Sequence, residues 1–341
     1  MSNYGVVHTG DVVYTKSPLK ANPYGIIKAN KGKPGIVSVL YGVYHTRENA
    51  NADFIQMYFE QDARLNNYLR PLVNKGAKNT LLISDTDALE GEVCLAPTFD
   101  EQKAIGQFFD SLDNLITLHQ RKFDKLQVLK KAMLEKMFPK NGSSVPEIRF
   151  KGFTDAWEQR KLGDNIVEYT EVTTENNQYP PLTSSRKGIF LQTEYFAGNQ
   201  IASDDNTGYN IVPYGYFTYR HMSDDEVFHF NINDIVEKGI VSTLYPVFTT
   251  DENLDSRYLQ YQLNYGHEFA KFAILQKQGG SRTYMYLNKL RQLHLTMPNH
   301  VEEQKAISSF FMNLDHLITL HQRELEKLQN IKKSMLEKMF V

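Results

Sequence analysis

The clearest hydrophobic pattern in the chain is a seam of apolar residues that recurs in alternating steps of four and three. In residues 101–138 this seam starts at Ile105, and eight of its ten positions are apolar. Residues 303–340 carry the same seam, starting at Ile307. Such spacing is typical of coiled coils. We therefore expect two long amphipathic helices of roughly 36 residues, each about 54 Å in length.

The two seams belong to an internal repeat. Residues 101–138 and 303–340 match at 27 of 38 positions without a gap, at an offset of 202 residues. The repeat continues upstream in weaker form, where residues 35–41 resemble residues 239–245. The chain is therefore two copies of one unit, each a variable globular part followed by a nearly invariant helix. Helices related by an internal two-fold would pack antiparallel; a simple spacer is the alternative.

The two copies differ in length. Residues 4–14 can be aligned with residues 209–219, but the second copy begins near Val145 and has 64 residues before Tyr209. The first copy has three residues before Tyr4. We therefore expect the first copy to begin inside a domain, with its opening segment absent.

Capping residues and histidines add detail to the two helices. Thr98 precedes Glu101 with the spacing of a capping box, and Asn299 offers a similar start to the second helix. Pro139 and Gly142 are expected to end the first helix. His119 and His321 fall on the seam. They are interpreted as a buried polar pair that fixes helix register, because ligands for a metal or catalytic role are missing around them.

The globular parts mix strand and helix patterns, which predicts an α+β fold class. Short strands are predicted at residues 12–14, 36–44, 92–96, 216–219 and 293–297. Helical spacing occurs at residues 54–69 and 256–275. Between each such helix and the last strand lies a basic, glycine-containing loop, at residues 74–79 and 277–282. These loops are either ordinary surface turns or sites where backbone N–H groups and basic side chains meet phosphates.

Basic residues in these loops and in neighbouring turns are the candidates for contact with nucleic acid. Arginine can recognise guanine edges, and lysine neutralises phosphates; a solvated surface charge is the alternative for each residue. The candidates are Lys28, Lys31, Lys33, Lys75, Lys78, Arg186, Lys187, Arg220, His221, Lys277 and Arg282.

Composition limits the class of protein. The net charge is −2, and residues 139–302 hold 15 basic and 20 acidic side chains, so any DNA contact needs local basic patches or a basic partner. The single cysteine, Cys94, excludes an internal disulfide. No run of 18 apolar residues and no signal peptide is visible, which predicts a soluble cytoplasmic protein without a membrane span.

Catalytic signatures are missing from the sequence. There is no GxxxxGK[ST] loop for nucleotide binding, and the ten histidines show no metal-binding spacing. Residues 22–24 (Asn-Pro-Tyr) resemble part of an amino-methyltransferase motif, but no glycine-rich cofactor strand precedes them. We expect no catalytic residue, no metal and no cofactor in this chain.

Three kinds of segment resemble the specificity subunits of type I restriction-modification systems. Residues 145–153 with 157–164 resemble the usual domain opening of that family. Residues 97–105 and 298–307 resemble its junctions between domain and helix, with Glu-Gln-Lys-Ala-Ile in both. The helix sequences Leu-Asp-x-Leu-Ile-Thr-Leu-His-Gln-Arg and Met-Leu-Glu-Lys-Met-Phe resemble its central and distal conserved regions. The resemblance covers the whole chain.

The resemblance implies two mixed α/β target-recognition domains that each recognise one half of a split DNA sequence. Two long helices would form an antiparallel coiled coil between them, in a pseudo-two-fold internal repeat. The implied boundaries are residues 1–97 for a first domain without its opening, 98–139 for the first helix, 140–298 for a linker and a complete second domain, and 299–341 for the second helix.

The resemblance also implies partners. Two modification subunits would dock on the helices and restriction subunits would join them; these partners would use S-adenosylmethionine, ATP and Mg²⁺. The exposed helix positions that we expect to contact them are Arg121, Lys125, Arg323 and Lys327. The alternative is a truncated or silent subunit that acts as a scaffold and recognises one half-site at most. An autonomous methyltransferase is disfavoured because its motifs are absent.

Overall fold

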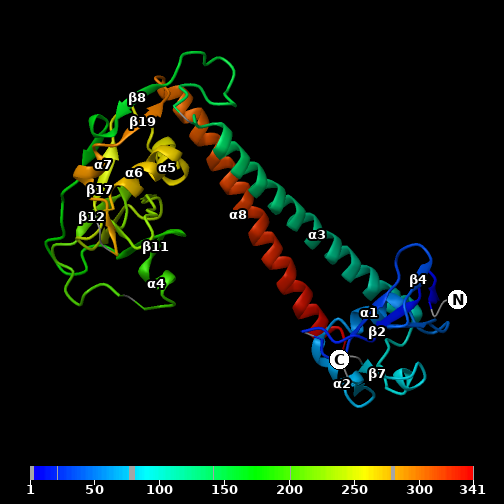
Figure 1. Cartoon of the computed structure of the whole chain (residues 1–341). Helices are drawn as coiled ribbons and strands as arrows, with labels where there is room; N and C mark the ends of the chain where they lie inside the picture. The colour runs from blue at the N-terminus through cyan, green and yellow to red at the C-terminus, as the bar shows by residue number, and fades with distance from the viewer. Residues whose placement is uncertain are drawn as a thin grey trace. The chain divides into compact units, whose positions relative to one another are not determined.

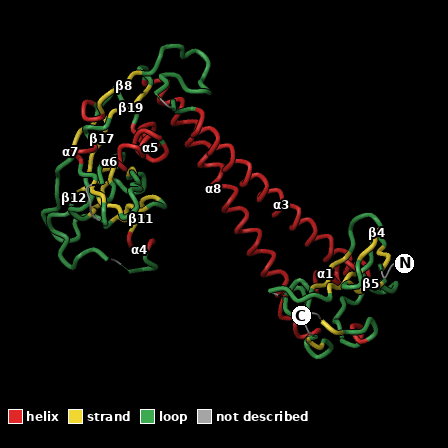
Figure 2. Tube along the Cα trace, viewed as in Figure 1, coloured by secondary structure: helices red, strands yellow, loops and turns green. Residues whose placement is uncertain are grey.

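The computed structural model describes residues 4–20, 22–76, 81–140, 142–199, 201–277 and 281–340. It divides into two compact units (Figure 1). The first unit comprises Met1–Asp124 with Ile318–Val341, and the second comprises Lys125–Leu317. Each unit therefore contains one globular part together with a part of each long helix. Strand is confined to the globular parts, and the long segments are helix alone (Figure 2).

The two long helices, α3 (Phe99–Lys136) and α8 (Val301–Lys338), have 38 residues each. Thr98 Oγ1 accepts a hydrogen bond from the Glu101 amide at 3.2 Å, which confirms the predicted cap. The Asn299 cap was wrong. The Asn299 amide instead donates to Glu158 and accepts from Arg160, because a strand of the second unit lies beside it.

The predicted seam is confirmed. Of its positions on both helices only Met339 is exposed; the others are buried or half-buried. The helices pack antiparallel within each unit. In the first unit Phe109 of α3 stacks on Phe340 beyond the end of α8, with ring centroids 5.9 Å apart. In the second unit Phe311 of α8 stacks on Phe138 beyond the end of α3, at 6.1 Å. These are equivalent contacts in the two copies.

The first globular part is built on a small antiparallel sheet with the order β3-β2-β5. A separate pair joins β1 to β4, another joins β6 to β7, and α1 packs against β2 and β3. The elements are β1 (Gly5–Val7), β2 (Val12–Thr15), β3 (Ile26–Ala29), β4 (Gly35–Val37), β5 (Tyr41–Tyr44), α1 (Ala52–Tyr58), α2 (Asp62–Leu69), β6 (Asn74–Lys75) and β7 (Leu81–Leu82).

The second globular part repeats this frame and adds to it. Its main sheet has the order β15-β13-β17-β9, and β12 pairs with β16. The elements are β8 (Glu158–Lys161), β9 (Ile166–Glu168), β10 (Leu182–Ser185), β11 (Gly188–Leu191), α4 (Gln192–Tyr195), β12 (Asn210–Pro213), β13 (Phe217–Thr218), β14 (Met222–Ser223), β15 (Asn231–Ile232), β16 (Lys238–Val241), β17 (Val247–Thr250), α5 (Ser256–Tyr265), α6 (His267–Leu275), β18 (Thr283–Tyr284), α7 (Leu287–Leu290) and β19 (His294–Met297).

Several predicted elements differ from those observed. Residues 92–96 form no strand, although the equivalent β19 pairs with β8. A strand needs a partner, and no described residue of the first unit supplies a counterpart of β8. The predicted strand at 36–44 is split between β4 and β5 by a turn, and each predicted helix of the globular parts is two shorter helices. In the second unit the break falls at Gly266, which follows α5.

A buried glutamine fixes each long helix to its globular part. The Gln102 amide donates to the carbonyls of Ala96 (2.9 Å) and Asn49 (3.1 Å) and accepts from the Asn51 amide (2.9 Å). Gln304 makes the equivalent bonds to Pro298, Asn253 and Asp255. Satisfied buried amides of this kind specify one geometry, because a shifted helix would leave them unpaired. Sequence reasoning noted the repeated Glu-Gln-Lys but not this role.

Candidate nucleic-acid interface

An acidic turn of the second unit gathers three of the predicted basic residues. The turn, residues 224–226, follows β14, and Glu226 adopts φ +60°. Arg282 Nε lies 2.9 Å from Asp224 Oδ1, Arg186 pairs with Asp225, and Lys277 pairs with Glu226. The pKa of Asp225 is held far below its usual range, first by its hydrogen bond from Arg186. Three basic side chains from two segments of the chain therefore converge on one exposed turn.

Arg220 lies beside this turn and lines a cavity of about 290 Å³ together with Arg186, Asp224 and Tyr245. It is exposed and forms no ion pair with a described residue. His229 lines the same cavity, and its pKa is lowered by burial and by the charges of Arg186 and Lys130. The cavity therefore combines two arginines, one carboxylate and a histidine whose pKa is lowered.

His221 is placed differently from the expectation. Its side chain is 7% exposed, its Nδ1 is hydrogen-bonded to the Leu244 carbonyl, and its ring stacks on Tyr286 at 4.9 Å. Tyr284 and Tyr286 are the exposed rings of this group, and they stack on each other at 5.9 Å. His221 therefore packs against Tyr284 and Tyr286, which sequence reasoning did not select, and its contact with DNA stays a prediction. The alternation of aromatic residues at 284 and 286 was the available signal.

The remaining basic and aromatic residues near the acidic turn differ in their exposure to solvent. Lys187 is exposed in the β10–β11 turn and forms no ion pair with a described residue. Tyr219, which lies among the basic residues in the sequence, is fully buried, and its hydroxyl donates to the Met285 carbonyl at 2.9 Å. It belongs to the core, whereas Tyr214 is 62% exposed.

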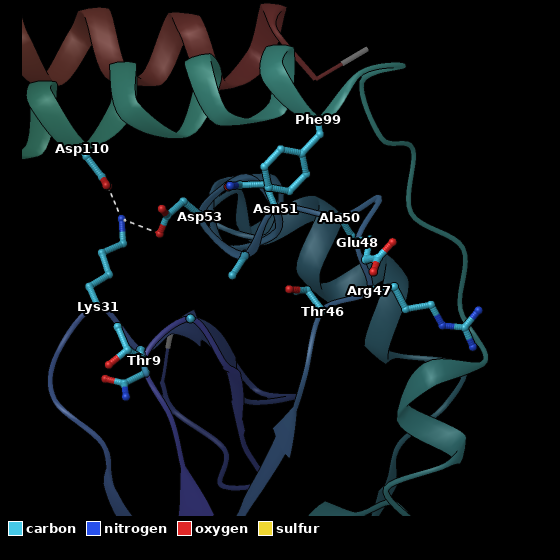
Figure 3. Close-up of a pocket in the computed structure, with 13 residues that line it drawn as sticks. Thr9, Lys31, Thr46, Arg47, Glu48, Ala50, Asn51, Asp53, Phe99 and Asp110 are labelled. Carbon is cyan, nitrogen blue, oxygen red and sulfur yellow. Dashed lines mark hydrogen bonds and ion pairs between the residues drawn. The ribbon is translucent and has the colours of Figure 1, made fainter.

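Two of the predicted lysines of the first unit form ion pairs with carboxylates. Lys31 Nζ lies 3.2 Å from Asp53 Oδ1 in α1 and also pairs with Asp110 in α3, so it bridges the globular part and the helix (Figure 3). Lys28 pairs with Glu60. Only Lys33 of these three is exposed without an ion pair to a described residue. Lys78 and the side chain of Lys75 lie outside the described residues.

Beside Lys31 the first unit has an open hollow of about 750 Å³ (Figure 3). Its lining includes Arg47, Glu48 and Phe99 along with Lys31. Acidic and basic groups are mixed there, and the lysine is already paired. Both this hollow and the cavity beside Arg220 therefore mix acidic and basic groups.

The four predicted partner-contact residues on the long helices, Arg121, Lys125, Arg323 and Lys327, are all exposed, and none forms an ion pair with a described residue. Exposed leucines accompany them at equivalent positions of the two copies: Leu115, Leu118, Leu317 and Leu320. The repeated Leu-x-x-Leu off the seam was the signal that could have identified these leucines from sequence.

Comparison with known proteins decides the family. Residues 155–330, more than half of the chain, match the type I restriction modification DNA specificity domain. The chain belongs to this family. It is thus a specificity subunit of a type I restriction-modification system, a component that is non-catalytic by itself.

Two curated relatives come from Methanocaldococcus jannaschii. The chain is 23% identical to the putative type I restriction enzyme MjaX specificity subunit, over 96% of the chain and 76% of that protein. It is 24% identical to the MjaVIII specificity subunit, over 70% of the chain and 59% of that protein. Among solved structures, the type I restriction-modification S subunit from M. genitalium shares the fold, with a TM-score of 0.60 at 12% identity over 98% of the chain and 84% of that structure.

Within the described ranges no cluster of three or more His, Cys, Asp or Glu side chains could hold a metal ion. No helix among the described residues is long and apolar enough to cross a bilayer.

Proposed function

We propose that this specificity subunit recognises a bipartite DNA target and directs adenine methylation or cleavage of that DNA by partner subunits. The observation that carries the proposal is the convergence of Arg186, Arg220, Lys277 and Arg282 around one exposed turn. The partners would be two modification subunits and the restriction subunits, which would use S-adenosylmethionine, ATP and Mg²⁺. The assembly would act in the cytoplasm.

The acidic turn suggests how the DNA contact forms. Arg282 and Arg186 are paired with carboxylates that are exposed, and such pairs contribute little stability. A phosphate can replace a carboxylate as the hydrogen-bonded partner of a guanidinium. Arg220 needs no exchange, because it has no described ion-pair partner. The exposed Tyr284 and Tyr286 would supply stacking or apolar contact beside these charges.

The duplicated helix surface supports docking of two identical partners. Arg121 and Lys125 recur as Arg323 and Lys327, and the accompanying leucines recur as well. A surface present twice in a pseudo-two-fold repeat suits two copies of one protein. The proposed division of labour assigns DNA recognition to residues 1–97 and 140–298, and partner docking to residues 98–139 and 299–341.

A domain exchange tests the proposal. Residues 145–298 are replaced by the corresponding segment of another specificity subunit, and methylated adenines are sequenced in cells that carry the complete system. We expect one half of the recognised sequence to change and the other half to stay the same. An unchanged methylation motif would contradict the assignment of residues 145–298 to recognition.

A second candidate function is a scaffold that recognises one half-site at most. It is favoured by the ion pairs of the first unit. Lys31 pairs with carboxylates of α1 and α3, and Lys28 pairs with Glu60. Footprinting of the chain together with its modification subunits separates the two functions. Protection of two separated segments supports bipartite recognition, and protection of one segment supports the scaffold.

A further inference from the structure

The second unit contains a layer that the described residues of the first unit lack. In the second unit, residues 147–169 place β8 beside β19 and β9 beside β17. The same segment buries Trp157, Leu162 and Ile166 in the hydrophobic core. The two units share the same arrangement of strands and helices. The second unit therefore shows which segment would cover the equivalent surface of the first unit.

Two backbone edges are open in the first unit. Residues 44–46 are equivalent to the part of β17 that pairs with β9, but β5 pairs only with β2 among the described strands. Residues 92–95 are equivalent to β19 and join no ladder. Met297 of β19 is fully buried, whereas the equivalent Leu95 is 36% exposed. Open edges of this kind accept an added strand.

An apolar cavity of about 350 Å³ connects these two edges. It reaches from Tyr44, at the end of β5, to Val93, and Val12, Tyr14 and Leu69 line it as well. The equivalent residues of the second unit pack in one core cluster with Leu162 and Ile166; they are Phe217, Tyr219, Phe248, Ala273 and Leu295. The cavity therefore lies where aliphatic side chains of the covering layer pack in the second unit.

A glutamate at the start of each long helix belongs to the same equivalent surfaces. In the second unit Glu303 is fully buried and accepts two hydrogen bonds from Arg149, at 2.6 and 2.8 Å, and one from the Trp157 indole at 3.2 Å. The equivalent Glu101 is exposed and forms no ion pair with a described residue. One helix start thus has its arginine partner and the other does not.

An aromatic ring shows the same contrast about two turns further along each helix. Phe310 of α8 packs edge-on against Phe150, with ring centroids 6.0 Å apart, and is half-buried. The equivalent Phe108 of α3 is 42% exposed. The two edges, the cavity, the carboxylate and the ring all correspond to contacts that the single segment 147–169 makes in the second unit.

We propose that this surface of the first unit is a docking site for a segment with the pattern of residues 147–169. The segment would place an arginine on Glu101, an aromatic ring on Phe108 and two aliphatic side chains in the cavity. It would add one strand to residues 92–95 and another to residues 44–46. The acidic charge of Glu101 selects a basic residue at that point, and the chain's own Arg149 shows the geometry.

A synthetic peptide with the sequence of residues 147–169 is the probe. It is titrated against the full chain by fluorescence anisotropy, and hydrogen exchange locates the contact. We expect saturable binding with new protection at residues 44–46 and 92–95. Glu101→Arg should weaken binding roughly tenfold or more, since like charges then meet. A peptide with Arg149→Glu should restore binding to that variant, and Asp124→Arg, an exposed carboxylate elsewhere on α3, is the matched control.

A tethered form removes the entropic cost of ordering a free peptide. The same sequence is fused ahead of Tyr4 through a flexible Gly/Ser linker, and exchange at residues 92–95 is compared with that of a fusion carrying a scrambled sequence. Absence of protection in both the free and the tethered form overturns the proposal, as does binding that Glu101→Arg leaves unchanged. If the untreated chain is a dimer that the peptide dissociates, the surface is occupied by a second copy of the chain, which overturns the proposal.

Discussion

The Nδ1 atoms of His119 and His321 lie 3.1 Å apart on the seam between α3 and α8. The two residues are equivalent in the repeat, so they meet at the pseudo-two-fold axis of the helix pair. One ring must therefore donate a proton to the other, and at most one of the two facing nitrogens can carry it. This contact agrees with the polar pair that the sequence predicted for the seam.

The histidine pair predicts a pH dependence of stability. Burial lowers the pKa of His321, and the charges of His119 and Lys122 lower it further. The unfolded chain therefore binds this proton more tightly, and the stability contribution is fully present above the ordinary histidine pKa of about 6.5. It is lost as the pH falls from that value toward the lowered pKa of the folded state. Thermal unfolding followed by circular dichroism should show a falling Tm, and His119→Asn with His321→Asn should flatten this slope. His316→Asn, an exposed histidine on α8, should keep it.

Glutamates at equivalent positions predict unequal effects on stability. Glu303→Ala leaves the Arg149 guanidinium without its buried partner, and we expect a loss of about 3–5 kcal/mol from the second unit. Glu101→Ala removes an exposed carboxylate and should change stability by less than about 0.5 kcal/mol. Urea denaturation, followed by tryptophan fluorescence and separately by limited proteolysis, measures the change in stability of each variant. Similar losses in the two variants would show that burial of Glu303 is not what stabilises that helix start.

The basic residues around the acidic turn predict a graded loss of DNA affinity. Arg220→Ala and Arg282→Ala should each weaken binding of the assembled complex by roughly 1–3 kcal/mol if the arginine contacts a base. Where the contact is to phosphate, the slope of log affinity against log salt should fall by about 1 instead. Lys151→Ala, an exposed lysine in the segment before β8, is the control. Fluorescence titrations at several salt concentrations distinguish these outcomes.

Neutralising the acidic turn should act in the opposite direction. Asp224→Asn with Asp225→Asn frees Arg282 and Arg186 from their intramolecular partners. Binding to DNA of unrelated sequence should then tighten, because the basic side chains no longer exchange a carboxylate for a phosphate. A weaker complex would indicate that the turn orients these arginines and does not compete for them.

Charge reversal on the helices tests partner docking. Arg121→Glu, Lys125→Glu, Arg323→Glu and Lys327→Glu combined should reduce co-purification of modification subunits while leaving the helical content intact, since these side chains are exposed and off the seam. Lys103→Glu with Lys305→Glu, also exposed and equivalent in the repeat, serves as control. Wild-type recovery of the modification subunit with the fourfold variant would place docking elsewhere.

The long helices were predictable because their stability follows from a local spacing. The seam that starts at Ile105 repeats every three or four residues, and burial follows the same interval in the fold. The strand predicted at residues 92–96 had equally suitable residues, but strand formation depends on a partner from elsewhere in the chain. The Asn299 cap failed for a related reason, since Glu158 and Arg160 occupy its amide.

The sequence could predict which residue types belong to the candidate site, but it could not predict how they are arranged in space. Arg186, Lys277 and Arg282 were selected because basic residues stood near glycine or in turns. Nothing in their spacing indicated that all three meet residues 224–226, because the turn is brought to them by long-range strand pairing.

The equivalence of the two helices has a consequence for shortened forms of the chain. Loss of one full period of 202 residues between the matching stretches would leave 139 residues, with one globular part and one helix. That helix would keep its apolar seam and the buried glutamine that fixes it to its globular part, but it would have no antiparallel partner helix in its own chain. Two such shortened chains should therefore associate, because the helix of each would bury the apolar seam of the other. We expect the single-copy form to be a symmetric dimer.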